Sequence, residues 1–218
     1  MDDILQFLNQ LAKNNNREWF AENKEWYQRC REKMFFLVDL LINEIRKFDV
    51  QIPVTDPAEN VFRIYRDVRF SKDKSPYKTH FGSYISKGGR KSHFAGYYIH
   101  IAPGESFVGG GLYVPEKEHL KAVRQHISHY PDEFLGIINN PGFKAIYPEM
   151  LDHRLKTAPK GFPKDHPYIH LLRYKSFVFS SPVTDEELIG ENFIEKSVSA
   201  FSHLYKVNSF LNEALETA

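Results

Sequence analysis

The sequence predicts an α+β fold in which an antiparallel sheet is flanked by N-terminal and C-terminal helices. Apolar residues recur at helical spacing up to about residue 48, alternate with a period of two from about 61 to 113, and return to helical spacing after 115. Because helices and strands are segregated along the chain, a parallel α/β sheet is not expected. We expect one domain over 1–218, with 1–50 helical, 60–114 forming the sheet and 115–218 mainly helical with one or two short strands.

The N-terminal part reads as two helical segments. Residues 2–13 place an apolar set on one helix face, which comprises Ile4, Leu5, Leu8, Leu11 and Ala12. The asparagines at 14–16 interrupt this pattern and supply an N-cap, since a short amide side chain accepts a hydrogen bond from a free backbone N–H. A longer helix is predicted over 17–48, with a break near Asn23, followed by a proline-containing loop over 51–60.

Four segments in the middle of the chain alternate as strands do, and a fifth follows later. The first four are 61–70, 81–86, 93–102 and 106–113. Gly88 and Gly89 lie between the second and third segments and are suited to a hairpin turn, because glycine tolerates positive φ. The turn at 103–105 is equally short, which predicts antiparallel neighbours. A further strand is expected over 175–180.

The C-terminal part is expected to be helical over 116–130, from Asp132 to Ile138, and over 191–214. Five prolines make 140–167 irregular, and Thr184 with Glu187 has the form of a capping box. The three glycines at 109–111 lack the spacing of a phosphate loop, so they indicate close backbone packing or a bulge.

Composition excludes several classes of protein. A lone cysteine, Cys30, rules out an internal disulfide, and the chain shows neither a signal sequence nor a membrane-length apolar run, so we expect a cytoplasmic protein without a membrane segment. The pairs His126/His129 and His166/His170 have helical spacing but no accompanying carboxylate at ligand spacing. No metal site and no cofactor are therefore expected.

The charge is unevenly distributed, although the net charge is only +1. Residues 63–91 hold nine basic and two acidic residues, whereas 185–218 hold seven acids and two lysines. Two interpretations remain open: the two regions pair within the fold, or the basic region meets an anionic ligand.

The segment from Arg63 to Lys78 is dense in functional side chains. As a strand it would place Arg63, Asp67 and Arg69 on one face and point Arg66 toward apolar surroundings, where it needs an acid or a bound anion. Guanidinium groups match phosphate and carboxylate geometry. The expected ligand-binding residues are Arg63, Arg66, Arg69 and Lys74.

Three residues are candidates for catalysis at this site, namely Asp67, Tyr77 and His100. Asp67 can orient the arginines, and Tyr77 can return its hydroxyl to them after the turn at Ser75 and Pro76. His100 alternates with Tyr98 on one strand face, so the two can join Asp67 in acid–base work, or simply hydrogen-bond across the sheet.

The same segment carries a family resemblance. The segment has the form R-x-x-R-D-x-R-F, followed by an acid and then by K-x-x-Y. The residues at the named positions are Arg63, Arg66, Asp67, Arg69, Phe70, Asp73, Lys74 and Tyr77. This pattern resembles that of a bacterial family of conserved hypothetical proteins, domain of unknown function 2461. The likeness extends over nearly the whole chain, through 7–8, 15–20, 109–113 and 175–177. It implies family membership but brings no activity and no catalytic residue.

Three functions follow from these observations. The leading hypothesis is a small anionic ligand, bearing phosphate or carboxylate, bound by the Arg/Asp/Tyr cluster, with enzymatic turnover left open. The alternative is a non-catalytic interaction or scaffold domain in which the same residues form an internal salt-bridge network. Nucleic-acid binding is third, because aromatics accompany the basic hairpins while the net charge is small and no named nucleic-acid motif occurs. The oligomeric state is not predicted.

Overall fold

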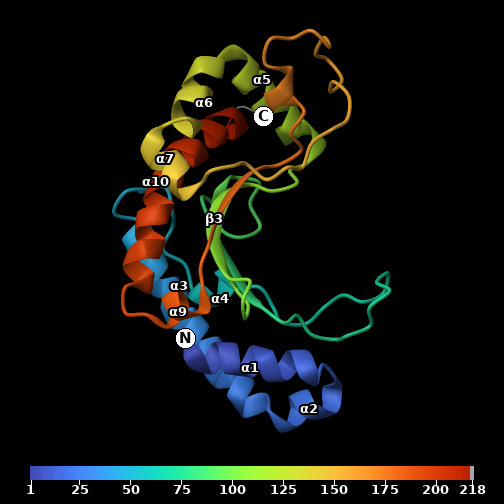
Figure 1. The fold of residues 1–218 in the computed structure, drawn as a ribbon, viewed down its shortest axis with the longest axis vertical. Helices are drawn as coiled ribbons and strands as arrows, with labels where there is room; N and C mark the ends of the chain where they lie inside the picture. The colour runs from blue at the N-terminus through green and yellow to red at the C-terminus, as the bar shows by residue number, and fades with distance from the viewer. Residues whose placement is uncertain (217–218) are drawn as a thin grey trace.

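A four-stranded antiparallel sheet with helices at both ends of the chain forms the structure, which confirms the predicted α+β class (Figure 1). The computed structural model describes residues 1–216. The strands follow one another in the order β1-β2-β3-β4. No helix within the described residues is long and apolar enough to cross a membrane.

The helices before the sheet are α1 (Asp2–Lys13), α2 (Arg17–Glu22), α3 (Lys24–Ile45) and α4 (Pro57–Asn60). The strands are β1 (Phe81–Ser86), β2 (Gly96–Ile101), β3 (Phe107–Leu112) and β4 (Phe177–Pro182). The later helices are α5 (Lys117–His129), α6 (Pro131–Ile138), α7 (Pro141–Ile146), α8 (Ile169–Leu172), α9 (Asp185–Ile189) and α10 (Phe193–Glu216). The predicted break at Asn23 and the capping box at Thr184 are both present.

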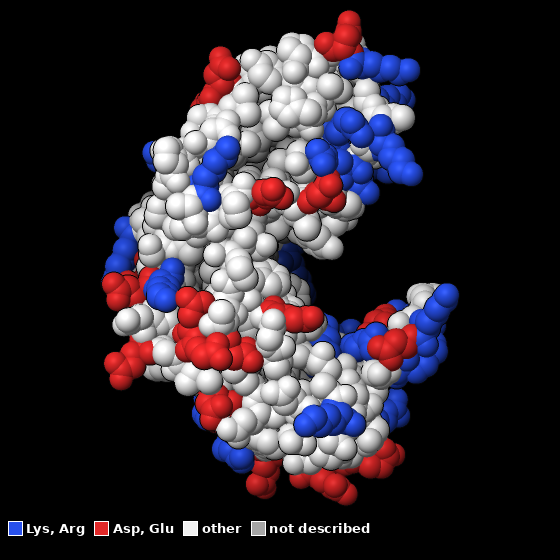
Figure 2. Space-filling model, in the orientation of Figure 1, with Lys and Arg blue, Asp and Glu red and all other residues white. Residues whose placement is uncertain are grey.

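The two faces of the sheet have different surroundings. Tyr97, Ile99 and Ile101 of β2 are buried on the face that α10 and α3 cover. Tyr98 and His100 point to the opposite face and are half-buried. In Figure 1 the long helices lie on one side of the sheet, and the space-filling view shows an open hollow on the other side (Figure 2). We call this second side the open face.

Glycines allow the neighbouring strands and α10 to pack closely around β3, as the run at 109–111 predicts. A Cβ on Gly110 would collide with the carbonyl oxygen of Gly96 and approach Leu204 of α10 to 3.1 Å. Gly111 has a φ of 107°, which L-residues rarely adopt.

Residues 61–80 do not contain the predicted strand over 61–70. The segment doubles back on itself instead: the N–H of Arg66 donates to the carbonyl of Pro76 (2.9 Å) and that of Lys78 donates to the carbonyl of Ile64 (2.8 Å). Its alternating apolar residues therefore do not share one buried face, and Phe70 is 97% exposed. We call residues 61–80 the first arm.

The hollow lies between the first arm and the segment 150–175, which is irregular apart from the short helix α8 and which we call the second arm (Figures 1 and 2). Each arm is anchored on an outer strand of the sheet. Val61 pairs with Ser83 of β1, and Met150 pairs with Phe179 of β4. The open face of the sheet thus forms the floor between the two arms.

Phe7 lies at the centre of an aromatic cluster that joins the N-terminal helices to the sheet. It is fully buried, and its ring centroid lies 5.6 Å from that of Trp26, 6.0 Å from that of Tyr27 and 6.5 Å from that of Phe81. The predicted apolar face of α1 included Ala12, which is exposed, and omitted Phe7.

Candidate functional site

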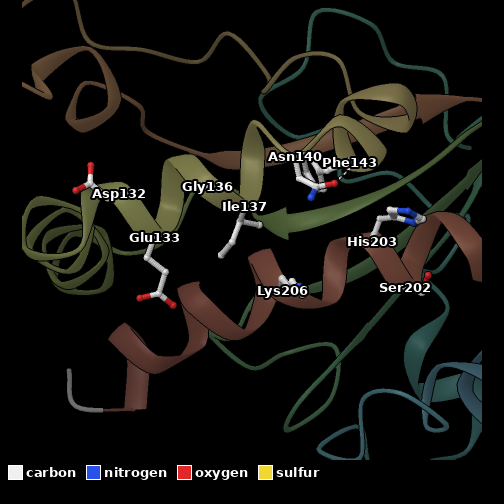
Figure 3. A pocket seen from close by; sticks show the side chains of 9 residues that line it. All are labelled: Asp132, Glu133, Gly136, Ile137, Asn140, Phe143, Ser202, His203 and Lys206. Atoms are coloured by element: carbon white, nitrogen blue, oxygen red, sulfur yellow. Dashed lines mark hydrogen bonds between the residues drawn. The ribbon is translucent and has the colours of Figure 1, made fainter.

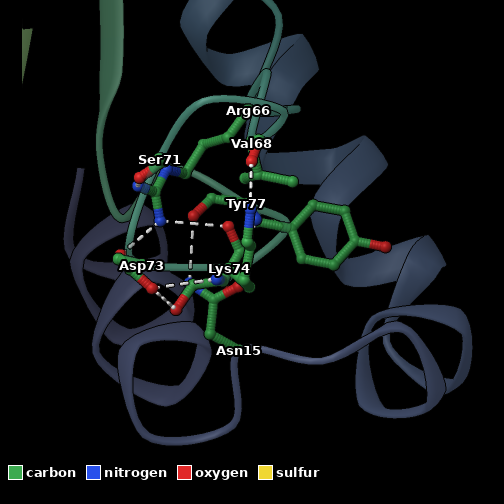
Figure 4. Close-up of polar contacts among 8 residues, drawn as sticks. Asn15, Arg66, Val68, Ser71, Asp73, Lys74 and Tyr77 are labelled. Atoms are coloured by element: carbon green, nitrogen blue, oxygen red, sulfur yellow. Dashed lines mark hydrogen bonds and ion pairs between the residues drawn. The ribbon is translucent and has the colours of Figure 1, made fainter.

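The first arm holds its own charged residues in a network (Figure 4). The Arg66 guanidinium donates to the Asp73 carboxylate (2.5 Å) and to the Ser75 carbonyl (3.0 Å). The hydroxyl and N–H of Ser75 donate to Asp73 as well, and together with Arg66 they lower the pKa of Asp73 to about 2. The Arg66 guanidinium therefore finds its hydrogen-bond acceptors and its acidic partner within the first arm.

Two further expected ligand-binding residues are also engaged within the arm. Arg69 makes a bidentate contact with the Asp67 carboxylate, from Nε to Oδ1 (2.9 Å) and from Nη2 to Oδ2 (2.6 Å). This contact lowers the pKa of Asp67. Lys74 donates to the carbonyl of Val68 at 2.9 Å. Asp67 therefore orients Arg69, which is one of the arginines that it was expected to orient.

Tyr77 anchors the arm to the helical part and points away from Arg66 in Figure 4. Its ring stacks on Phe20 with centroids 4.0 Å apart, and it is 6% exposed. The side chain of Asn15 accepts from the Tyr77 N–H (3.1 Å) and donates to the Tyr77 carbonyl (3.0 Å). Apolar packing thus takes the hydroxyl away from the arginines, contrary to the expectation that it returns to them.

Arg63, the fourth expected ligand-binding residue, lies near a different group of cations on the open face, close enough for its charge to lower the pKa of Lys78. Lys78 and Arg90 lie over the ring of Phe62, at 5.5 and 4.8 Å from its centroid, and Phe62 itself packs on Tyr98. Burial and the charges of Arg63 and Arg90 lower the pKa of Lys78. Within residues 1–216, no carboxylate lies at ion-pair distance from these three cations.

Aromatic rings continue from this group across the open face. The hydroxyl of Tyr98 lies 3.1 Å from Nδ1 of His100, so the expected pair forms. The His100 ring stacks on Phe107 (4.8 Å) and lies 4.3 Å from the ring of His80. Asp67 is bound to Arg69 and does not take part in this pair. The open-face cluster, as we use the term, comprises Phe62, Arg63, Lys78, His80, Arg90, Tyr98, His100 and Phe107.

Both histidines of the open-face cluster are poor bases. Burial, His100 and Lys78 lower the pKa of His80 to about 4, and burial also lowers the pKa of His100. Each imidazole is therefore neutral at pH 7 and can donate one hydrogen bond from one ring nitrogen and accept one at the other.

Replacing His80 by glutamine should reduce the loss of stability on acidification. The folded protein resists protonating His80 down to about pH 4, whereas the unfolded chain takes up that proton near pH 6.5, so stability falls as the pH drops from 6.5 towards 4. Thermal melts at pH 7.5 and 5 measure the effect, and the melting temperature of His80→Gln should change less than that of the wild type. His129→Gln, at the exposed end of α5, is the matched control. Equal losses in wild type and His80→Gln would contradict this assignment.

Other concave or reactive places are less suited to an anion. A pocket of about 350 Å³ lies between α6, α7 and α10, and its lining mixes Asp132 and Glu133 with His203 and Lys206 (Figure 3). Among the described residues, no group of histidine, cysteine and acidic side chains has the geometry of a metal site. Burial is the largest effect on Cys30 and raises its pKa to about 12, which keeps it a thiol.

The second arm is a basic feature that the sequence analysis missed. Residues 150–175 contain six basic residues and two acids, and Lys156, Lys160 and Lys164 are exposed. A count of charges over this irregular segment would have found it. Figure 2 shows Lys and Arg side chains gathered on both sides of the hollow.

Comparison with protein-family models gives a match over nearly the whole chain. The family described as conserved hypothetical protein (DUF2461) matches residues 3–210 of the chain. No curated protein and no solved structure matches it.

Proposed function

The chain belongs to the DUF2461 family of conserved hypothetical proteins, and we propose that it binds a small anionic ligand, bearing phosphate or carboxylate, at the open-face cluster. The observation that carries this proposal is the pair of cations Lys78 and Arg90 over the ring of Phe62, without a carboxylate at ion-pair distance among residues 1–216, and with Arg63 close enough for its charge to lower the pKa of Lys78. Like charges kept together raise the free energy of the empty protein, and a bound anion relieves that repulsion.

The rest of the open-face cluster suits the same ligand. The guanidinium groups offer paired donors to phosphate or carboxylate oxygens. The half-buried Lys78 interacts more strongly with an anion than a fully solvated lysine does, because partial burial lowers the effective dielectric. The Tyr98–His100 pair adds neutral hydrogen-bonding groups beside the cations. The network of Arg66, Asp67, Arg69 and Asp73 then serves to shape the first arm.

Lys78→Met should distinguish this proposal from an internal salt-bridge network. Methionine keeps the packing volume and removes the charge, so the melting temperature without anion should stay the same or rise as repulsion is relieved. Titration with inorganic phosphate or pyrophosphate should stabilise the wild type by mass action, and Lys78→Met should lose most of that stabilisation. Differential scanning calorimetry and isothermal titration calorimetry measure the two effects.

Two comparison variants locate the anion. Lys144→Met removes an exposed lysine of α7 on the helical side of the sheet and should leave phosphate binding unchanged. Arg63→Ala should weaken phosphate binding more than Arg69→Ala, because Asp67 engages Arg69. If Lys78→Met lowers the melting temperature without anion and phosphate stabilises neither protein, the cations belong to a structural network and the proposal fails.

A further inference from the structure

Two arms of the same charge face each other across the hollow. Each contains six basic residues and two acidic ones, although the whole chain has a net charge of only +1. Within residues 1–216, no acid pairs with Lys156, Lys160 or Lys164. The fold thus gathers positive charge on both sides of one hollow (Figure 2). A concave surface lined by one sign of charge favours a ligand of the opposite sign.

The separation of the arms indicates an extended ligand. Their bases pair with the outer strands, Val61 with Ser83 of β1 and Met150 with Phe179 of β4. Five interstrand spacings separate these bases, and at about 4.8 Å each they amount to roughly 24 Å. One phosphate or carboxylate group at the open-face cluster cannot contact the second arm as well. A chain with repeated negative charges can contact both.

One exposed aromatic ring indicates which chemical groups the ligand carries between its charges. Phe62 and Phe107 are half-buried and already pack against Lys78 and Arg90 and against His100, respectively. Phe70 lies 97% exposed at the tip of the first arm, where the Arg69 guanidinium approaches its ring to 5.9 Å. Bases of a single strand have free faces that can stack on such an exposed ring, whereas a duplex hides the faces of its bases.

We propose that the hollow binds single-stranded nucleic acid, with its phosphates on the two arms and a base stacked on the exposed ring of Phe70. The proposal rests on the anion binding inferred above and names its ligand class, since the open-face cluster would hold one phosphate of the strand. A chain of carboxylates can pair with the basic arms but has no flat rings that could stack on an aromatic side chain. It should therefore bind less tightly than single-stranded nucleic acid.

The test uses the full chain and a fluorescently labelled oligothymidylate of about 20 nucleotides, followed by fluorescence anisotropy. The oligonucleotide should bind more tightly than a duplex of the same length, and its affinity should fall as salt is raised. A poly-glutamate peptide of equal charge should compete poorly. Tighter duplex binding, or equal competition by poly-glutamate, would overturn the proposal in favour of a duplex or an acidic partner.

Variants of the second arm separate this proposal from the proposed function. Replacing Lys156, Lys160 and Lys164 by alanine should reduce the steepness with which log affinity falls against log salt by about 2, because each lost phosphate contact accounts for about 0.7. Binding of inorganic phosphate should be unchanged. The matched control replaces three exposed lysines near or on the helices that cover the other side of the sheet, Lys47, Lys144 and Lys206. Oligonucleotide binding that is equal in the two triple variants would overturn the proposal.

Phe70→Ala tests the stacking contact without risk to the fold, because the side chain is 97% exposed. It should weaken oligothymidylate binding by about 10-fold. Phe36→Ala, at a 66% exposed position on α3, is the matched control and should not weaken it. Equal binding by both phenylalanine variants would exclude stacking at Phe70 and overturn the proposed mode.

The phosphate experiment separates the two possible failures. Phosphate binding without oligonucleotide binding would overturn the nucleic-acid proposal and leave the proposed function standing. Absence of both would overturn both.

Discussion

Gly111→Ala should destabilise the protein by about 4 kcal/mol, because two independent penalties combine at this position. The backbone φ of 107° is strained for any L-residue, which costs about 1–3 kcal/mol. The new Cβ would also collide with the carbonyl oxygen of Phe177 on β4, so β3 and β4 must separate locally at a cost of a further 1–3 kcal/mol, about that of overpacking a core. Urea titration followed by circular dichroism measures the change in unfolding free energy.

Gly136→Ala is the matched control for this substitution. Gly136 lies in α6, and an added Cβ there has no neighbour within 4 Å. Alanine should therefore stabilise the protein by about 0.5–1 kcal/mol through its higher helix propensity. A loss below about 1 kcal/mol in Gly111→Ala would show that β3 can relax around the new methyl group.

Phe7→Ala should destabilise the protein by about 3–5 kcal/mol, the usual cost of truncating a fully buried phenylalanine. The ring contacts aromatic side chains of α2, α3 and β1, so its loss leaves a cavity where the helical part meets the sheet. Both tryptophans of the chain, Trp19 and Trp26, lie against it, with ring centroids 6.0 and 5.6 Å away. Their emission should therefore shift in the folded variant, and it also reports the denaturant midpoint.

Phe36→Ala serves as the control, because that side chain is 66% exposed on the same helical part. Its effect on stability should remain within about 0.5 kcal/mol. If Phe7→Ala were as stable as Phe36→Ala, the aromatic cluster would not stabilise the junction between α1, α3 and β1.

Local patterns predicted most of the helices and the sheet. The helix over 2–13 has the bounds of α1, and the strand over 81–86 has those of β1, because periodicity and breaking residues are local signals. Which residues of a helix or strand face the core depends on the other helices and strands that pack against it. Phe7 was therefore missed and Ala12 was misplaced.

The first arm shows where local patterns fail. Alternation over 61–70 favours a strand, yet the backbone hydrogen bonds of Arg66 and Lys78 lie within the arm, and nothing in the alternation specifies such partners. The same limit applies to the candidate site. Arg63 was identified, but the neighbouring pair Lys78 and Arg90 was not, because that pair forms only when Phe62 packs on Tyr98.

The bases of the arms also bear on self-association. An outer strand with free N–H and carbonyl groups is a template on which another chain can add a strand and begin to aggregate. Here the N–H of Phe62 donates to the carbonyl of Gly82 (2.9 Å), and the N–H of Leu151 donates to the carbonyl of Val178 (2.8 Å), so each border of the sheet is partly capped by the chain itself. Deleting an arm would leave the outer strand beside it with unpaired N–H and carbonyl groups. Truncated forms should therefore precipitate on heating, under conditions in which the intact chain should refold on cooling.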